Sequence, residues 1–349
     1  PAYYEDTDLA MKIHENNMRV VFQPQSQIIH LEGQSCGDDI EKGIKSYQAK
    51  NKIKFLNKSI DSLENHYEDG LNISEALNKN SKGNILIIED LLLDPDGDAG
   101  SLYMINICLA FKSLGYNVSY IPADNYYLMT DKSCNMGSRG IEVIAHPRLN
   151  NIKDLKDFKG KIPVSYDRKF DLALVARPSN LEAIDILRET YPNIKILYYT
   201  HDLHHVRTKI TAQNATDNFK KSQLLKTSKE LENLEKQIFA KSDVVLHVSE
   251  EEEEVAQQLI IHKSLVLPPV GQEIKPTPNI FKNRFQLLFL GNFNHMPNID
   301  GIIWFIEKVF PIILLNNKNI HLNIVGGSIN KLTEKINIDN KNIKMIGYV

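Results

Sequence analysis

The chain has 349 residues, which is enough for two or three domains rather than one. Its 41 Lys and Arg residues nearly balance 44 Asp and Glu residues, and the net charge of −3 without a basic stripe argues against a nucleic acid partner. The cysteines, Cys36, Cys108 and Cys134, lack the spacing of a zinc or redox site and fit a reducing cytosol. No apolar run of about 18 residues is present, so any membrane association is expected to be peripheral, at the inner face of the membrane.

The part of the chain before residue 83 does not follow a simple alternation of strands and helices. The elements expected there are a helix, two short strands, a polar helix and a polar linker, at residues 7–17, 20–24, 27–33, 43–56 and 59–82. The linker is poor in large apolar groups and has only a helical tendency. We therefore place a first domain at residues 1–58 and a linker at residues 59–82.

Residues 83–268 alternate runs rich in Val, Ile and Leu with helical stretches. The expected strands, in chain order, are NILIIEDLL, YNVSYIPA, FDLALVARP, IKILYYTHD and DVVLHVS. A helix follows the first strand and ends at Gly115, another covers residues 180–191, and one long polar helix precedes DVVLHVS. The acidic run at residues 250–254 predicts the start of a solvated helix capped by Ser249. This pattern is typical of an α/β domain with a doubly wound, Rossmann-like parallel sheet.

A second α/β domain is predicted from residue 269, after the connector that begins LPPVGQEIKPTPN. QLLFLG, HLNIVGG and IKMIGYV are predicted strands, and residues 299–315 form an apolar helix in which Trp304 and Phe305 are expected in the core. Residues 269–349 are too few for a whole domain of this kind. Because the chain also begins without Met in a charged segment, we expect a piece of a longer protein with a truncated last domain.

The turn between the first strand and the first helix of the sheet domain is DPDGDAGS, from Asp94 to Ser101. Free N–H groups at the start of that helix meet at the carboxyl edge of the sheet, where open α/β proteins bind ligands. The dinucleotide pattern GxGxxG and the P-loop pattern are both absent. Three carboxylates would repel a bare phosphate, so a neutral, hydroxyl-rich acceptor suits the turn better. The alternative is a solvated turn with Ser101 as the helix cap.

The run ILIIED is also compatible with the first strand of a phosphoacceptor receiver domain, which ends in an acidic pair. Such a domain needs an Asp at the end of its third strand. FDLALVARP instead ends in Arg177 and Pro178, which disfavours a receiver domain.

From residue 83 onward the chain resembles the front part of bacterial GT-B glycosyltransferases of the family-four type. The resemblance rests on ILIIEDLLLDPDGDAGSLYMINICLAFKSLGYNVSYIP, FDLALVARP, ILYYTHDLHHVR, KSDVVLHVSEEEEEV, LPPVG and LLFLGNFNHMPNIDGIIWFIEKVFPII. It implies an acceptor domain at residues 83–268 and the start of a donor domain at residues 269–349, two Rossmann-like domains that face each other across a cleft. It implies that the turn lines this cleft and binds substrate through Gly97, Asp98, Gly100 and Ser101.

The segment YYTHDLHHVR carries the next candidates. His201 and Asp202 follow a strand end, where side chains point into the crevice, and are predicted as catalytic groups that hydrogen-bond in the active site. His204 and Arg207 are predicted to bind substrate, and Arg207 suits a phosphate or carboxylate. A metal site and purely structural capping are the alternatives, although the resembling GT-B enzymes need no metal. His247 is expected to be a core residue.

In the second domain, backbone amides after the first strand are expected to approach the diphosphate of a nucleotide-sugar, at Gly291, Asn292 and Asn294. The resemblance implies that the acidic motif and glycine-rich loop that hold the donor would lie beyond Val349. The fragment alone is therefore expected to be inactive.

Residues 1–58 resemble the tail of a family-two-like GT-A glycosyltransferase in the segment YYEDTDLAMKIHENNMRVVFQPQSQIIHLEGQSCG. This resemblance implies that Asp6, beside Glu5 at a helix start, is the general base that takes the proton of the acceptor hydroxyl. It also implies a divalent cation, Mn²⁺ or Mg²⁺, with His30 as a metal or diphosphate contact. The alternative is that the acids favour a helix N-terminus and that His30 is a lone strand histidine.

Together these features predict a cytoplasmic glycosyltransferase of the hexosyltransferase type that acts in bacterial surface polysaccharide synthesis. A UDP- or GDP-sugar is the expected donor and a saccharide or lipid-linked molecule the acceptor, with retention in the GT-B part and inversion in the GT-A part. One alternative is a noncatalytic carbohydrate-binding or scaffold module of a polysaccharide assembly complex. Another is a sugar-nucleotide epimerase or dehydrogenase, which the missing GxGxxG pattern disfavours.

Overall fold

The chain divides into two compact units, the first formed mainly by residues up to Asn84 and the second by residues from Ile85 onward. The computed structural model describes residues 3–16, 18, 20, 26–29, 43–64, 66–67, 73–95, 97–123, 131–144, 169–269, 271, 286–336 and 340–349.

The described part of the first unit is helical. Its helices are α1 (Glu5–Glu15), α2 (Ser46–Lys58), α3 (Ile60–Leu63) and α4 (Ile73–Asn78). The rings of Tyr4 and Phe55 pack at 5.6 Å between centroids, and Asp8 forms an ion pair with Lys58, so the start of α1 is held against α2.

The two strands predicted in this unit are only partly open to comparison. Residues 27–29, which begin the second of them, have no regular secondary structure, and Ile28 and Ile29 are 87% and 90% exposed. The strand prediction is wrong for these residues, because neither isoleucine buries a face that would hold the segment in a strand. Most of the remaining positions lie outside the described residues.

The second unit contains a seven-stranded sheet with the order β3-β2-β1-β4-β5-β6-β7. The strands are β1 (Asn84–Glu89), β2 (Asn117–Pro122), β3 (Glu142–Val143), β4 (Leu172–Ala176), β5 (Lys195–Tyr199), β6 (Val244–His247) and β7 (Ser264–Val266). The pairs β1–β4, β2–β3, β4–β5, β5–β6 and β6–β7 are all parallel, which confirms the predicted parallel sheet. The strand order reverses between β1 and β4, and ligands of open α/β sheets bind at such a switch point.

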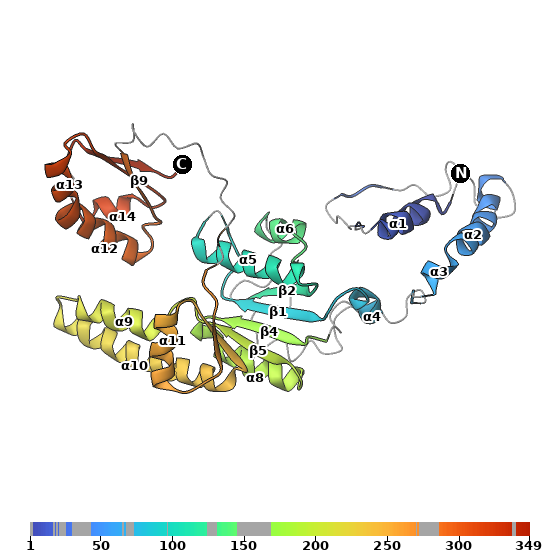
Figure 1. Ribbon diagram of the computed structural model, residues 1–349, viewed down its shortest axis with the longest axis horizontal. Coiled ribbons are helices and arrows are strands. Elements are labelled where there is room, and N and C mark those ends of the chain that lie inside the picture. Colours follow the sequence, from blue (N-terminus) through green and yellow to red (C-terminus); the bar gives the residue numbers. More distant parts are fainter. Residues whose placement is uncertain are drawn as a thin grey trace. The chain divides into compact units, whose positions relative to one another are not determined.

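Helices cover both faces of this sheet. They are α5 (Ala99–Ser113), α6 (Asp131–Ser138), α8 (Leu181–Thr190), α9 (His204–Gln213), α10 (Asn218–Lys241) and α11 (Glu250–Leu259). Figure 1 shows α5 and α6 on one side of the sheet and α8 on the other. All six residues of β1 are buried, with Ile85 and Ile87 in one core cluster with Met104 and Cys108 of α5. Burial of both strand faces explains why β1 is continuously apolar rather than alternating.

The structure differs from one alternative and from one prediction about these helices. The N-cap of α5 is Asp98, whose carboxylate accepts hydrogen bonds from the backbone N–H of Ser101 at 2.8 Å and from its hydroxyl at 2.7 Å. Ser101 is therefore the partner of the cap rather than the cap. The single long helix expected before β6 is two helices, because Asp217 caps a new one by accepting from the N–H of Lys220 at 2.6 Å.

A second, three-stranded parallel sheet has the order β10-β9-β8. Its elements are β8 (Gln286–Leu290), α12 (Met296–Trp304), a π-helical segment (Phe305–Val309), α13 (Phe310–Asn316), β9 (His321–Val325), α14 (Asn330–Thr333) and β10 (Ile343–Gly347). Phe305 packs against the core of this sheet, whereas Trp304 is 60% exposed, so its predicted core position is wrong. The π-helical turns change the angular step per residue, so residues on either side of them no longer follow the α-helical spacing from which the core was predicted.

Candidate active site

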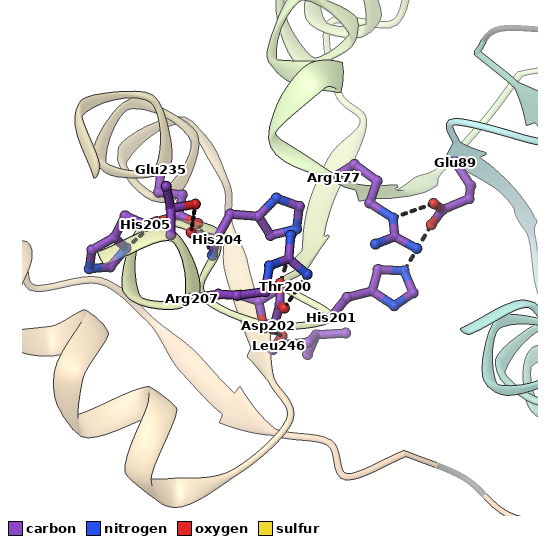
Figure 2. A network of polar contacts seen from close by, with 11 residues as sticks. Glu89, Arg177, Thr200, His201, Asp202, His204, His205, Arg207, Glu235 and Leu246 are labelled. Atoms are coloured by element: carbon purple, nitrogen blue, oxygen red, sulfur yellow. Dashed lines mark hydrogen bonds and ion pairs between the residues drawn. The ribbon is translucent and has the colours of Figure 1, made fainter. Parts of the chain in front are cut away.

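Three neighbouring strand ends of the seven-stranded sheet place charged and polar side chains in contact. Glu89 is the last residue of β1, Arg177 directly follows β4, and His201 lies two residues after β5. One carboxylate oxygen of Glu89 accepts from Nε of Arg177 at 2.6 Å, and the other lies 2.8 Å from Nε2 of His201. Figure 2 shows both side chains directed toward Glu89. The network lies at the switch point between β1 and β4, where the topology predicts a ligand site.

The Glu89 carboxylate is ionised in spite of its burial. Glu89 is only 5% exposed, and burial alone would raise its pKa, but the hydrogen bond from His201 and the charge of Arg177 lower that pKa overall. Burial alone would likewise lower the pKa of Arg177, and the charge and hydrogen bond of Glu89 raise it. The pair is thus a buried ion pair, and removal of one partner would leave an uncompensated charge.

Both partners of Glu89 have a strained backbone. Arg177 has φ 68° and ψ 139°, and His201 has φ 53°, in the positive range that side chains other than glycine rarely adopt. Each such residue costs about 1–3 kcal/mol and persists only where its surroundings hold it. Two strained residues at adjacent strand ends, both bonded to the same carboxylate, are typical of a functional site rather than of a solvated turn.

The start of α9 adds a second group of polar contacts (Figure 2). Nη1 of Arg207 donates to Asp202 at 2.7 Å, so the predicted anion-binding arginine has a carboxylate partner within the chain. Nε2 of His204 lies 3.0 Å from Oδ1 of Asp202, but the two are not aligned for a hydrogen bond, and each is a buried polar atom without such a partner. Burial lowers the pKa of His204 more than the Asp202 carboxylate raises it, so the ring is neutral at neutral pH.

Glu235 of α10 fixes the direction of this segment. It is 1% exposed, and its carboxylate accepts from the backbone N–H of His204 at 2.7 Å and from the ring of His205. The hydroxyl of Ser228 also donates to the carbonyl of His205 at 2.8 Å. The long helix α10 therefore holds the first turn of α9 and, with it, the side chains of His204 and Arg207.

The turn before α5 is built largely from its own contacts. Asp94 forms an ion pair with Lys132 at 2.7 Å, and Asp98 is occupied by the cap of α5. A Cβ added to Gly97 would lie 2.9 Å from the Asp94 carboxylate, so the turn is closely packed there. Gly100 lies close to the network, since a Cβ on it would lie 3.6 Å from Nη2 of Arg177. The 94–101 turn and the 201–207 segment thus lie at the same edge of the sheet, as expected for a shared site.

A cavity of about 950 Å³ lies beside this edge within the second unit. Its lining residues include Asp202, Leu203, Val206, Arg207 and Ile210 of the α9 region, Lys220 of α10, Glu252 and Val255 of α11, and Met296 and Lys335. Burial, with a smaller contribution from the charge of Asp202, raises the pKa of Glu252 to about 7, although a backbone hydrogen bond from Leu203 opposes the shift. The predicted start of a helix at the acidic run and its cap at Ser249 are confirmed. The prediction that this helix is solvated is wrong for Glu252, whose side chain lines the cavity.

The remaining predicted residues lie in other parts of the chain. Asn292 forms a local turn in which its side-chain oxygen accepts from the N–H of Asn294 at 2.9 Å, and a Cβ on Gly291 would press on Asn298 at 3.1 Å. Glu5 and Asp6 are exposed in the first turn of α1, and His30 lies outside the described residues. The roles predicted for these residues, including a cation contact at His30, stay predictions. Among the described residues no three His, Cys, Asp or Glu side chains gather as a metal-binding set.

Glu89 and Arg177 are the site residues that the sequence analysis missed. Arg177 was used there only to argue against a receiver domain. The signal was present, because each residue stands at the carboxyl end of a predicted parallel strand, and such ends meet at one edge of the sheet. The same rule that selected His201 would have selected both.

Comparisons with known proteins concern the fold and one short stretch of sequence. No family model matches the chain. The crystal structure of TarM is similar with a TM-score of 0.52 and 12% identity, covering 77% of each chain. The structure of Anabaena Alr3699/HepE in complex with UDP and glucose gives a TM-score of 0.46 and 13% identity, over 76% of this chain and 70% of that one. An uncharacterized 44.6 kDa protein in the cps region of Klebsiella pneumoniae is 36% identical over 50 residues, which are 14% of this chain and 13% of that protein.

The similarity to TarM shows that the chain has the same overall α/β fold over that region, and at 12% identity it shows the fold alone. None of the described helices is long and apolar enough to cross a membrane.

Proposed function

We propose that this chain belongs to a glycosyltransferase that moves a sugar from a nucleotide-sugar to a saccharide or lipid-linked acceptor. The observation that carries the proposal is the Glu89, Arg177 and His201 network, with its two strained residues at the switch point of a parallel sheet. The resemblance of the sequence to GT-B glycosyltransferases names the chemistry, and the fold similarity to TarM is in keeping with it. Fold alone would not assign a reaction.

In this proposal His201 and Asp202 hydrogen-bond the reacting sugars, and His204 and Arg207 complete the wall of the site. The Arg207–Asp202 ion pair fixes the carboxylate while one of its oxygens stays without a hydrogen-bond partner, and a sugar hydroxyl would satisfy that oxygen. Gly97, Asp98, Gly100 and Ser101 form the neighbouring wall on the acceptor side. Gly291, Asn292 and Asn294 would approach the donor diphosphate, and this part would use no metal.

For the first unit we propose the remnant of a GT-A domain, with Asp6 as general base beside Glu5 and a divalent cation near His30. The exposure of Glu5 and Asp6 leaves both carboxylates accessible to a ligand. In this proposal the domain boundaries are 1–58, 59–82, 83–268 and 269–349, and the chain is a piece of a longer enzyme.

The setting we propose is bacterial surface polysaccharide synthesis at the inner face of the membrane. The matching stretch in a protein of the Klebsiella cps region agrees with this setting. The tip of the α9–α10 hairpin also suits an anionic lipid surface, because Phe219 is 72% exposed and is followed directly by Lys220 and Lys221. In the described part of the chain neither of these two lysines has a carboxylate partner, so their charges are available.

The experiment that tests the proposal is a measurement of UDP or GDP release by the protein that carries this chain, with a panel of nucleotide-sugars and oligosaccharide acceptors. His201→Ala is expected to lower release by about 100-fold or more. His321→Ala, at an exposed position of β9, is the matched control and should keep the parent rate. Equal rates for His201→Ala and the parent would refute the assignment. Oligosaccharide binding without any nucleotide release would favour the noncatalytic module instead.

A further inference from the structure

The carboxylate of Glu89 is arranged to control its neighbours rather than to meet a ligand. It is 5% exposed, and each of its oxygens already has one partner, Nε of Arg177 or Nε2 of His201. A group buried in this way acts on a substrate only through the side chains that it holds. His201 is 10% exposed and also packs edge-on against Tyr199, with 4.7 Å between ring centroids, so its ring is held from two sides.

An ionised carboxylate can only accept hydrogen bonds, and this decides where the hydrogen of the His201 ring lies. Because the ring contacts Glu89 through Nε2, the neutral ring must carry its hydrogen on Nε2 to form that bond. Nδ1 then has a free lone pair and is an acceptor. The lowered pKa of Glu89 keeps the carboxylate charged near neutral pH, which maintains this tautomer.

The charges of the network cancel when the ring is neutral. Glu89 carries one negative charge and Arg177 one positive charge, and the adjacent Asp202 and Arg207 form a second neutral pair. A site with no net charge and a ring nitrogen that accepts a hydrogen bond fits an uncharged hydroxyl better than a phosphate.

We propose that Glu89 is a positioning residue that fixes the Nε2–H tautomer of His201, so that Nδ1 accepts a hydrogen bond from a hydroxyl of a neutral saccharide. The proposal rests on the proposed glycosyl transfer and names the substrate class on this side of the site. Arg177 is the second positioning residue, because its hydrogen bond to one oxygen of Glu89 helps to hold the carboxylate whose other oxygen meets His201.

The tautomer can be measured without any activity. In protein with ¹⁵N-labelled histidine, the two ring nitrogens are distinguished by their shifts and two-bond couplings, and His201 is assigned by its loss in His201→Asn. The parent should show the Nε2–H form. Glu89→Gln keeps the shape, and its carboxamide can accept from Arg177 while donating to Nε2 of His201, so the hydrogen should move to Nδ1.

The kinetic arm uses the same variants. Glu89→Gln is expected to lower kcat about 10- to 100-fold with a smaller change in KM, as for other residues that orient an active-site group. Glu89→Asp, which keeps the charge, should retain the tautomer and recover part of the rate. Asp243→Asn is the matched control, because Asp243 forms ion pairs with Arg188 and Lys195 immediately before β6, at the opposite edge of the sheet, and should change neither readout.

Each result decides one part of the proposal. A parent His201 in the Nδ1–H form or in the doubly protonated form would overturn the role of Glu89, and the parent spectrum alone decides this. A tautomer unchanged in folded Glu89→Gln would overturn that role as well. A shifted tautomer with undiminished kcat would overturn its link to the reaction. A shifted tautomer in a protein that transfers no sugar would refute the proposed function and leave the coupling of Glu89 to His201 intact. Broadening of the His201 signal by a phosphorylated sugar but not by a neutral one would overturn the substrate class.

Discussion

Acidification tests a second buried histidine network, in which His247 faces His262. Nε2 of His247 lies 2.9 Å from Nε2 of His262, whose Nδ1 is 2.7 Å from the carbonyl of Ile260. A carbonyl only accepts, so His262 carries its hydrogen on Nδ1 and accepts at Nε2, and His247 donates from Nε2. Nδ1 of His247 is then a buried lone pair without a hydrogen-bond partner, as its environment shows. Protonation of either ring would place an N–H where no acceptor lies.

The size of the effect follows from the pKa of His247. Burial and the neighbouring His262 together lower this pKa from 6.5 to about 4, against a smaller opposing effect of Glu253. The folded-state pKa is thus below the unfolded-state pKa, so the unfolded chain binds the proton first as the pH falls. The contribution to stability is present above about pH 6.5 and is lost as the pH falls toward 4. Between pH 7 and pH 5 the loss is about 2 kcal/mol of the free energy of unfolding.

Glu252 works in the opposite direction within the same range. Burial raises the pKa of Glu252 to about 7, so the folded state holds a proton that the unfolded state has released, and this contribution to stability grows as the pH falls from 7. The two contributions are of similar size and largely cancel in the parent. His247→Leu should therefore shift the response toward a gain of stability on acidification, whereas Glu252→Gln should expose the loss caused by His247.

The assay is urea unfolding followed by circular dichroism at pH 7 and pH 5, for the parent, His247→Leu and the exposed control His321→Leu. The drop in the free energy of unfolding should be about 2 kcal/mol smaller in His247→Leu than in the parent, and unchanged in the control. Identical pH dependence in the parent and His247→Leu would refute the assignment of the buried, neutral ring, whatever the absolute stability of the variant.

Further outcomes follow from other contacts. Arg177→Gly should be more stable than Arg177→Ala by about 1 kcal/mol in urea unfolding. Both variants lose the guanidinium, but only glycine adopts φ 68° without strain, so equal stabilities would contradict a strained backbone at this position. Gly326→Ala should abolish the folded three-stranded sheet or lower its Tm steeply, because a Cβ at this position would lie 1.8 Å from the carbonyl oxygen of Gly291. Gly301→Ala is the control, because a Cβ at residue 301 has no neighbouring atom within 4 Å. Lys220→Glu with Lys221→Glu should abolish sedimentation with vesicles rich in phosphatidylglycerol, whereas Lys318→Glu with Lys341→Glu should not, and an equal effect of both pairs would contradict a specific surface.

Much of the sheet domain could be predicted because its signals are local. The run NILIIE is apolar throughout, and such continuity arises only where both faces of a strand are covered, as they are at Ile85 and Ile87 on one side and Leu86 and Ile88 on the other. The wrong predictions come from competition between local signals. Ser101 and Asp98 are both good caps, and the choice between them depends on where the chain turns after Gly97, which spacing does not reveal.

The site could be predicted only in part, for a different reason. His201 and Asp202 stand out because polar residues follow an apolar strand, but Glu89 reads as one acid among several in IIEDLLLDPDGD, and Arg177 as a residue before a proline. What joins them is the strand order, in which β4 returns to the side of β1 after β2 and β3 have extended the other way. No pattern within a single segment encodes that return. Glu89 is separated by 88 residues from Arg177 and by 112 residues from His201. These contacts therefore form only when β1, β4 and β5 pair in the sheet. A change that disrupts this pairing would separate His201 from the Glu89 carboxylate without replacing any residue of the site.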